Sequence, residues 1–500
     1  MKKKTAALML ITASTLTAGC NSHPLGLSDD NAVETANNNG IRIVVNSLGM
    51  TFPEGMDENH NPYLSYIEKN TGVNVNVTLP PLNGYDEKLN VIMASGDPPD
   101  LLNTSDPSWF IHFVNQKALT PLNAYIDKYG SNLKARIPKE AWDNVTVDGN
   151  IYAIPSLNEV KGTEIVYARK DWLDKLGLKP PKTIDEFTAV MRAFAEQDPD
   201  GDGQKDTYGL SILERMRRTS PFLGAFGVQM NGWYERDGKL VYAGILPEMK
   251  NALLYLRSLY DEGILDPEFP LNKIDVLGDK IAHGRVGLYS AAWSDTRSHI
   301  AANMKNDPKA EWIPLDFPVG PSGNHGVYRT SVVRSYNVVP VKSQQAEAVV
   351  KFLDFIAGPG QIPLKLGFEN EIWTRVNGKL SINFAEHTKH GYRGIYGALE
   401  DMADPGVTKD RLEGLGEQFR LYDNVQRIEG NLMEDKFTGP PTPAMGKHQV
   451  KLNKLQEDTF TRIIAGLSPI EEFDAFVKKW KEAGGDEITG EVNEWWREQQ

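Results

Sequence analysis

The chain has few thiols, a deficit of positive charge and no long apolar run. Its 500 residues include one cysteine, Cys20, which excludes a disulfide framework and zinc sites built from clustered thiolates. Lysine and arginine number 54 against 67 aspartate and glutamate residues, and the net charge of -13 argues against a nucleic-acid-binding protein, because it repels phosphate backbones. No run approaches the ~18 apolar residues of a membrane-spanning helix. The G-x-S-x-G, H-E-x-x-H, P-loop and G-x-G-x-x-G motifs are absent too, which removes common signatures of enzymes.

The N-terminal segment has the pattern of an export signal. Lysines occupy positions 2–4, residues 5–17 are apolar or small, and the stretch ends in LTAGC, with Cys20 last. This ending resembles a bacterial lipobox, in which the cysteine is acylated and the chain is cut before it. We therefore expect residues 1–20 to be a lipoprotein signal peptide, Cys20 to carry the lipid, and the polar residues 21–40 to form a flexible tether. The protein would then be held on the extracellular face of the bacterial cytoplasmic membrane through its lipid anchor only.

From residue 41 onward the sequence alternates between strand and helix patterns. The β-branched run 41–45 and the alternating run 73–79 predict strands, whereas the apolar spacing over 62–71 and 85–94 predicts helices. Such a repeat is typical of an α/β fold with a largely parallel sheet. We interpret the amphipathic stripes further along the chain as helices that pack on a core.

Five segments, in register along the chain, resemble a known family. They are Met93–Leu101 (MASGDPPDL), Asp148–Pro155 (DGNIYAIP), Arg169–Phe187 (RKDWLDKLGLKPPKTIDEF), Gly284–Trp293 (GRVGLYSAAW) and Gly484–Trp495 (GGDEITGEVNEW). Together they resemble the bacterial extracellular solute-binding proteins of family 1, and within it the large lipoprotein branch that includes alginate-oligosaccharide-binding proteins. The resemblance implies a two-lobed, periplasmic-binding-protein-like (type II) fold with a hinge and an interlobe ligand cleft.

The resemblance also implies that the chain passes between the lobes about three times. We place these crossings near 155–158, 328–332 and 396–401. Lobe 1 would then comprise residues 41–155 plus 330–400, and lobe 2 would comprise residues 156–329 plus 401–500.

An acidic loop within lobe 2 has the spacing of a calcium site. Over residues 198–209, oxygen donors occur at the first, third, fifth, seventh and ninth positions, with a glycine at the sixth. The twelfth position is Gly209, so the bidentate glutamate of an EF-hand is absent. The alternative is a solvated acidic turn. We expect a structural Ca2+, and the candidate ligands are Asp198, Asp200, Asp202, Gln204, Asp206 and Thr207.

Sugar-binding sites combine aromatic platforms with charged and amide groups that make paired hydrogen bonds. The resemblance places a sugar-stacking tryptophan at Trp293, and each tryptophan named here has a role in the core as its alternative. Arg297 and Arg334 would suit an acidic sugar, although lone arginines are usually surface groups. The candidate ligand-binding residues are Trp293, Trp373, Trp233, Trp109, Arg169, Asp106 and Tyr152. For Arg169, an inter-element salt bridge is an equal alternative to a contact with a ligand carboxylate.

The sequence thus favours a lipid-anchored solute-binding protein that binds an oligosaccharide and hands it to the transmembrane subunits of an ABC permease. We expect a monomer without catalytic residues and without nucleic-acid partners. The main alternative is a cell-tethered polysaccharide-degrading enzyme, either a lyase or a glycoside hydrolase. A calcium-dependent adhesin, a peptide-binding protein and a metal site at His387 and His390 are weaker alternatives.

Overall fold

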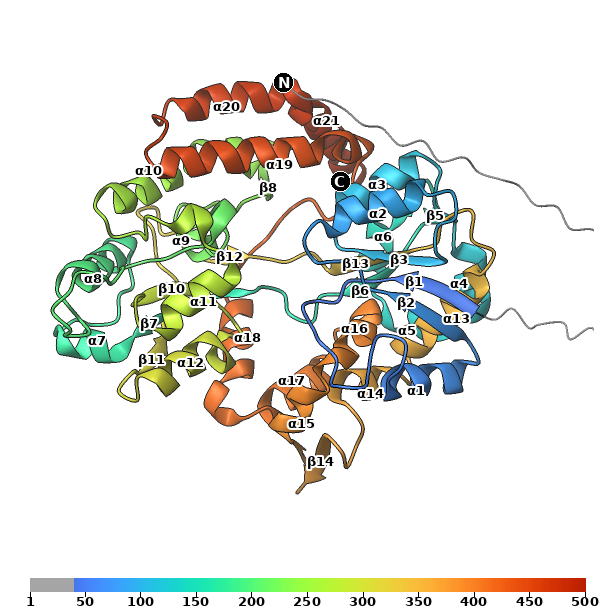
Figure 1. Cartoon of the computed structure of the whole chain (residues 1–500). Coiled ribbons are helices and arrows are strands. Elements are labelled where there is room, and N and C mark those ends of the chain that lie inside the picture. The colour runs from blue at the N-terminus through green and yellow to red at the C-terminus, as the bar shows by residue number, and fades with distance from the viewer. Residues whose placement is uncertain (1–39) are drawn as a thin grey trace, which may run out of the picture. The chain divides into compact units, whose positions relative to one another are not determined.

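The computed structural model describes residues 40–500, and two β-sheets organise this part of the chain (Figure 1). In the larger sheet, the first three strands are parallel and β13 runs antiparallel to both of its neighbours. The strand order is β2 (Asn74–Thr78), β1 (Gly40–Val44), β3 (Leu101–Thr104), β13 (Val333–Val338) and β6 (Ile154–Leu157). Strand β13, which lies between β3 and β6, therefore comes from more than 200 residues downstream of β3.

Helices cover both faces of the five-stranded sheet. Figure 1 shows α2 (Tyr85–Ala94) and α3 (Pro107–Asn115) above it, and α1 (Pro62–Thr71) and α13 (Ala346–Ala357) below it. Helix α1 begins where the side chain of Asn61 accepts hydrogen bonds from the backbone amides of its first turn, and it ends at Gly72 with φ 67°. The strands and helices predicted between residues 41 and 96 are therefore confirmed.

The second sheet has three antiparallel strands, with β7 (Glu164–Arg169) between β10 (Leu288–Ala292) and β11 (Trp312–Pro314). A separate hydrophobic core packs on one face of this sheet and extends beneath five longer helices, and a second cluster covers the other face. These are α8 (Ile184–Glu196), α10 (Pro247–Asp261), α19 (Pro443–Ile464), α20 (Glu472–Trp480) and α21 (Asp486–Glu498).

The remaining elements are short. The further helices are α4 (Asn123–Tyr129), α5 (Ser131–Arg136), α6 (Lys139–Asn144), α7 (Lys170–Lys175), α9 (Ser220–Gly224), α11 (Ile274–Ala282), α12 (His299–Asn306), α14 (Gln361–Leu366), α15 (Phe384–Lys389), α16 (Gly394–Gly397), α17 (Pro405–Gly414) and α18 (Leu421–Glu429). The two-stranded pairs are β4 (Thr146–Val147) with β5 (Asn150–Ile151), β8 (Trp233–Arg236) with β9 (Lys239–Tyr242), β12 (Val327–Tyr328) with β16 (Leu432–Met433), and β14 (Trp373–Val376) with β15 (Lys379–Ile382). Within residues 40–500, none of the helices is long and apolar enough to cross a membrane.

The chain passes between the two cores through segments that lie side by side. The first core takes its buried residues from 41–157 and 333–402, and the clusters around the smaller sheet take theirs from 160–327 and 412–492. Backbone amides of Leu157 and Asn158 donate to the carbonyls of Asp401 and Val332, at 2.9 and 3.0 Å. Backbone hydrogen bonds therefore join the three segments that link the two cores.

Candidate functional site

A cavity of about 360 Å3 opens where the two cores meet at the carboxyl end of β3. Its walls carry an unusual density of rings, which is why we call it the aromatic cavity. Asn144 Nδ2 donates to the carbonyl of Thr438 at 2.8 Å, so residues of both cores are in contact at its edge. The aromatic lining residues are Trp233, Tyr242, Tyr328, Tyr336 and Phe437.

Polar groups hold these rings in place. Asp435 accepts hydrogen bonds from the backbone amides of Trp233 and Phe437, at 3.1 and 3.0 Å, and burial raises the pKa of its carboxyl to about 6. The hydroxyl of Tyr242 lies 2.7 Å from Oδ1 of Asn231. Asp106 also lines the cavity and caps α3 by accepting from the amide of Ser108. The cavity is therefore preorganised, with apolar ring faces beside hydrogen-bonding groups.

A second cavity, of about 550 Å3, is lined by five basic side chains and two carboxylates, and we call it the cationic cavity. Trp293, which is half-buried, lies in its wall, and its stacking on a sugar stays a prediction. Its charged lining residues are Arg297, Arg334, Lys365, Arg393, Arg411, Glu159 and Asp401.

A small cavity of about 60 Å3 joins these two along the carboxyl edge of the five-stranded sheet. It shares Ser105 with the aromatic cavity, and it shares Leu48, Arg334 and Ala398 with the cationic cavity. The three cavities therefore lie next to one another in one row.

Ion pairs stabilise one wall of the cationic cavity. Glu159 lies 2.6 Å from Nη2 of Arg411 and 3.1 Å from Nζ of Lys365, which also contacts Asp401 at 2.8 Å. Burial alone would raise the pKa of Glu159, but Arg411 and Lys365 outweigh burial and lower it to about 2. Glu159 is therefore an ionised carboxylate that is fully engaged by its neighbours.

Four of the predicted ligand-binding residues line none of these three cavities. Trp373 is buried and donates its indole N–H to the carbonyl of Gly367 at 2.8 Å. Trp109 packs on Phe113, and Tyr152 packs against the first core. These placements favour the packing role that was the alternative for the two tryptophans, and they place Tyr152 in packing as well.

Arg169 is likewise an interior residue. It is 2% exposed, pairs with Asp171 and Asp307, and lies over the ring of Trp172. Its charge is therefore satisfied within the fold, which favours the inter-element salt bridge that was the alternative to a contact with a ligand carboxylate.

Several residues that line the cavities were not identified from the sequence. Phe437 and Asp435 are examples from the aromatic cavity, and Arg393 and Arg411 are examples from the cationic cavity. No local signal identifies them, because they reach the cavities only through long-range packing.

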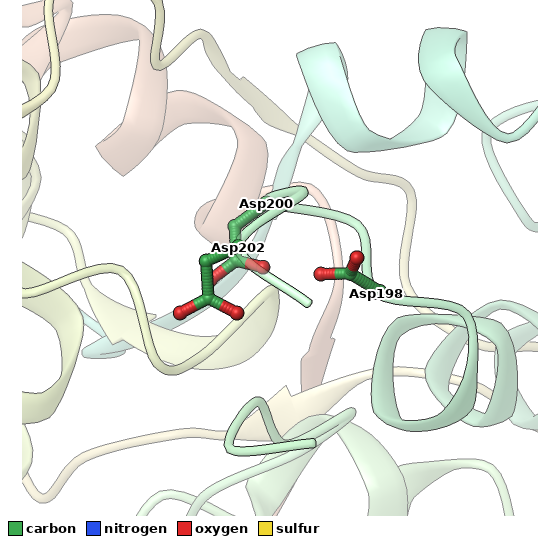
Figure 2. A group of neighbouring side chains, drawn as sticks. All are labelled: Asp198, Asp200 and Asp202. Atoms are coloured by element: carbon green, nitrogen blue, oxygen red, sulfur yellow. The ribbon is translucent and has the colours of Figure 1, made fainter. Parts of the chain in front are cut away.

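The acidic loop after α8 brings three carboxylates together (Figure 2). Oxygen atoms of Asp198, Asp200 and Asp202 lie within 4.8 Å of one another, with Asp198 across from the other two. Burial, the neighbouring Asp198 and the charge of Asp202 together raise the pKa of Asp200. This crowding of like charges suits a hard cation, and the carboxylate oxygens of the group fit Ca2+ chemistry.

The other predicted calcium ligands are arranged differently. Thr207 is buried and donates its hydroxyl to the carbonyl of Phe194 at 2.8 Å, so that group is committed to the fold. Gln204 donates its side-chain amide to Asp202, which leaves its backbone carbonyl as the donor that the loop spacing predicts. Asp206 is not a member of the three-carboxylate group.

The family model described as bacterial extracellular solute-binding protein matches residues 47–362. Lipoprotein LipO of Bacillus subtilis (strain 168) is 27% identical over 517 residues, covering 99% of this chain and 98% of LipO. The polygalacturonan/rhamnogalacturonan-binding protein YtcQ of the same strain is 26% identical over 445 residues, covering 86% of each chain.

Solved structures show the same fold. The crystal structure of alginate-binding protein AlgQ2 without calcium ion has a TM-score of 0.76 at 20% identity and covers 92% of this chain and 98% of AlgQ2. An EF-hand mutant of the S. pneumoniae ABC-transporter substrate-binding protein FusA, in complex with fructo-nystose, has a TM-score of 0.72 at 19% identity and covers 92% and 99% of the two chains. The predicted α/β, two-lobed solute-binding fold is therefore confirmed.

Proposed function

Because the chain belongs to the bacterial extracellular solute-binding protein family, we propose that it binds an oligosaccharide in the row of cavities and delivers it to the transmembrane subunits of an ABC importer. The observation that carries this proposal is the aromatic cavity, where five rings and several hydrogen-bonding groups line one space. Ring faces match the C–H faces of sugars, and the polar groups match their hydroxyls.

The names of the relatives support a carbohydrate ligand. YtcQ is named for polygalacturonan and rhamnogalacturonan, and the FusA structure holds fructo-nystose. Both are named for binding rather than for cleavage, which favours a receptor over the polysaccharide-degrading enzyme that the sequence leaves open.

We retain the two predicted lobes, 41–155 plus 330–400 and 156–329 plus 401–500, as the units that would close on the ligand. The connecting segments contain few residues and are joined by backbone hydrogen bonds, which suits a hinge. Closure would create the surface that a permease recognises as the loaded state.

The membrane attachment belongs to the same proposal. Residues 1–20, the acylated Cys20 and most of the tether lie outside the described residues, so this part rests on the sequence pattern alone. Metabolic labelling with a palmitate analogue tests it: the wild-type chain should be labelled in bacterial cells, and Cys20→Ser should abolish the label.

We also propose a structural Ca2+ at Asp198, Asp200 and Asp202, with the carbonyl of Gln204 as a further donor. When bound, the ion would neutralise three crowded carboxylates and brace the loop that follows α8. It takes no part in ligand chemistry, because these residues line none of the cavities described above.

Native mass spectrometry with a panel of plant, algal and fructan oligosaccharides tests the proposed function. We expect one intact oligosaccharide per chain and unchanged oligosaccharide after prolonged incubation. Shortened products would support the enzyme instead, and a chain that binds no member of the panel would contradict the proposal.

A further inference from the structure

The cationic cavity contains more positive charge than its own acids neutralise. Five basic side chains face two carboxylates there, although the whole chain carries a net charge of -13. Glu159 and Asp401, the two acids, are already paired with Lys365 and Arg411. Three arginines therefore remain without an acidic partner.

These three arginines come from separate elements and converge on one space. Arg297 follows β10, Arg334 lies on β13, and Arg393 precedes α16. Within residues 40–500, neither Arg297 nor Arg334 forms an ion pair or a side-chain hydrogen bond. Among the same described residues, the Arg393 side chain forms hydrogen bonds only with backbone carbonyl oxygens and with His387. Three guanidinium groups without carboxylates are costly to hold together unless an anion joins them.

Buried donors in the same wall are also unsatisfied. Among the described residues, the Nε atoms of Arg393 and Arg411 are buried and have no hydrogen-bond partner. Native proteins leave few such groups unpaired, and each one points to a missing acceptor.

The pKa of the neighbouring His387 reflects the positive potential of these arginines. Burial, reinforced by the charges of Arg393, Arg411 and Arg297, lowers the pKa of His387 to about 3. His387 is therefore neutral at physiological pH, and its Nδ1 lies 2.7 Å from Nη2 of Arg393. The histidine thus does not add to the repulsion, and its ring nitrogen is engaged with an arginine.

We propose that the cationic cavity binds the carboxylate of an acidic sugar, so that the ligand is a uronate-containing oligosaccharide whose neighbouring units extend into the aromatic cavity. This inference rests on the proposed function. The planar guanidinium forks of Arg297 and Arg334 match a carboxylate in two parallel hydrogen bonds, and the half-buried ring of Trp293 offers a stacking face in the same wall. Ser105 and Arg334 line the small cavity that lies between the two larger ones, and one chain of sugars would extend along it.

Isothermal titration calorimetry with matched ligands tests this proposal. The probes are oligogalacturonides, alginate oligosaccharides, the same oligomers after chemical reduction of their carboxyl groups, sulfated galactan oligosaccharides and neutral fructo-oligosaccharides. At least one uronate oligomer should bind at least tenfold more tightly than its carboxyl-reduced form, and its affinity should fall as NaCl is raised.

The variants Arg297→Gln and Arg334→Gln separate charge recognition from general sugar binding. Each should weaken binding of the uronate oligomer by about tenfold or more while leaving a carboxyl-reduced oligomer little affected. Arg136→Gln is the matched control, because Arg136 is an exposed arginine on α5 that lines none of the cavities. Circular dichroism spectra and melting temperatures of the variants verify that they are folded.

The outcomes distinguish this inference from the function on which it rests. Tight binding of only neutral or carboxyl-reduced oligomers, or of only sulfated ones, would overturn the carboxylate proposal and leave oligosaccharide binding intact. A uronate oligomer whose affinity is the same in wild type and in both arginine variants would overturn the placement in this cavity. Failure to bind every probe would overturn both proposals.

Discussion

Replacing Glu159 with glutamine tests the ion-pair network beside the connecting segments. Glu159 is 14% exposed, and its carboxylate pairs with Arg411 and Lys365, which are 10% and 9% exposed. It also accepts a hydrogen bond from the hydroxyl of Thr408 at 2.8 Å. Glu159→Gln keeps the shape of the side chain but removes the charge that holds two buried cations, so we expect the fold to lose stability.

The pKa of Glu159 sets the size of the effect. Its fall from 4.5 to about 2 corresponds to a stabilisation of about 3 kcal/mol at neutral pH. Removing one partner from a buried ion pair costs about 3–5 kcal/mol, which is a similar magnitude. We therefore expect Glu159→Gln to lower the free energy of unfolding by about 3 kcal/mol at pH 7.

The difference in stability between wild type and Glu159→Gln should depend on pH. Because the pKa of Glu159 is lower in the folded state, its stabilisation is complete above about pH 4.5 and is lost as the pH falls towards 2. The difference between wild type and variant should therefore shrink across that interval. Urea unfolding, followed by tryptophan fluorescence at several pH values, measures it.

Glu347→Gln is the matched control for Glu159→Gln. Glu347 pairs with Lys351 at 2.6 Å, but both side chains are more than 40% exposed. Its removal should leave the free energy of unfolding almost unchanged, since solvent screens exposed pairs. Equal effects of the two substitutions would refute the reasoning that burial makes the Glu159 network stabilising.

Two further predictions concern other carboxylates. Added Ca2+ should raise the melting temperature of the wild type by about 3 °C or more, and Asp200→Asn should abolish this shift. The control Asp237→Asn, at the exposed β8–β9 turn, should retain it. Equal shifts in both variants would contradict the calcium site. Glu400 is fully buried, accepts from Asn337 at 2.8 Å, and has a pKa that burial raises well above its usual value. Because its folded pKa is raised, wild-type stability should decline as the pH rises from 5 to 8. Glu400→Gln should remove that decline while changing the stability at pH 5 by less than about 1 kcal/mol, and a variant with the same pH profile as wild type would contradict the assignment.

Local features of the fold could be predicted because their causes lie close together in sequence. Asp148 and Gly149 form a two-residue turn with φ values of 50° and 77°, and the β4–β5 hairpin closes around them. The capping box of α8 pairs Thr183 with Glu186, only three residues away. Each signal is complete within a short window of sequence.

The cavities could be predicted only in part, because distant segments build them. Trp293 lies in a motif that points to a ligand role, and its ring does line the cationic cavity. By contrast, Glu159, Lys365 and Arg411 are separated by up to 252 residues, and nothing in their local sequence couples them. The buried positions of Trp373 and Arg169 follow from tertiary packing, which a tryptophan or an arginine in isolation does not reveal.

The central claim is that an oligosaccharide lies in the row of cavities, and calorimetric titration of two aromatic variants tests it most directly. Trp293→Ala and Phe437→Ala remove half-buried rings from the cationic and aromatic cavities, whereas Trp496→Ala removes a half-buried ring on α21 that lines none of the cavities. We predict that one oligosaccharide binds per wild-type chain and that each cavity variant weakens binding by about tenfold, while Trp496→Ala retains wild-type affinity. Undiminished affinity in both cavity variants would contradict the claim.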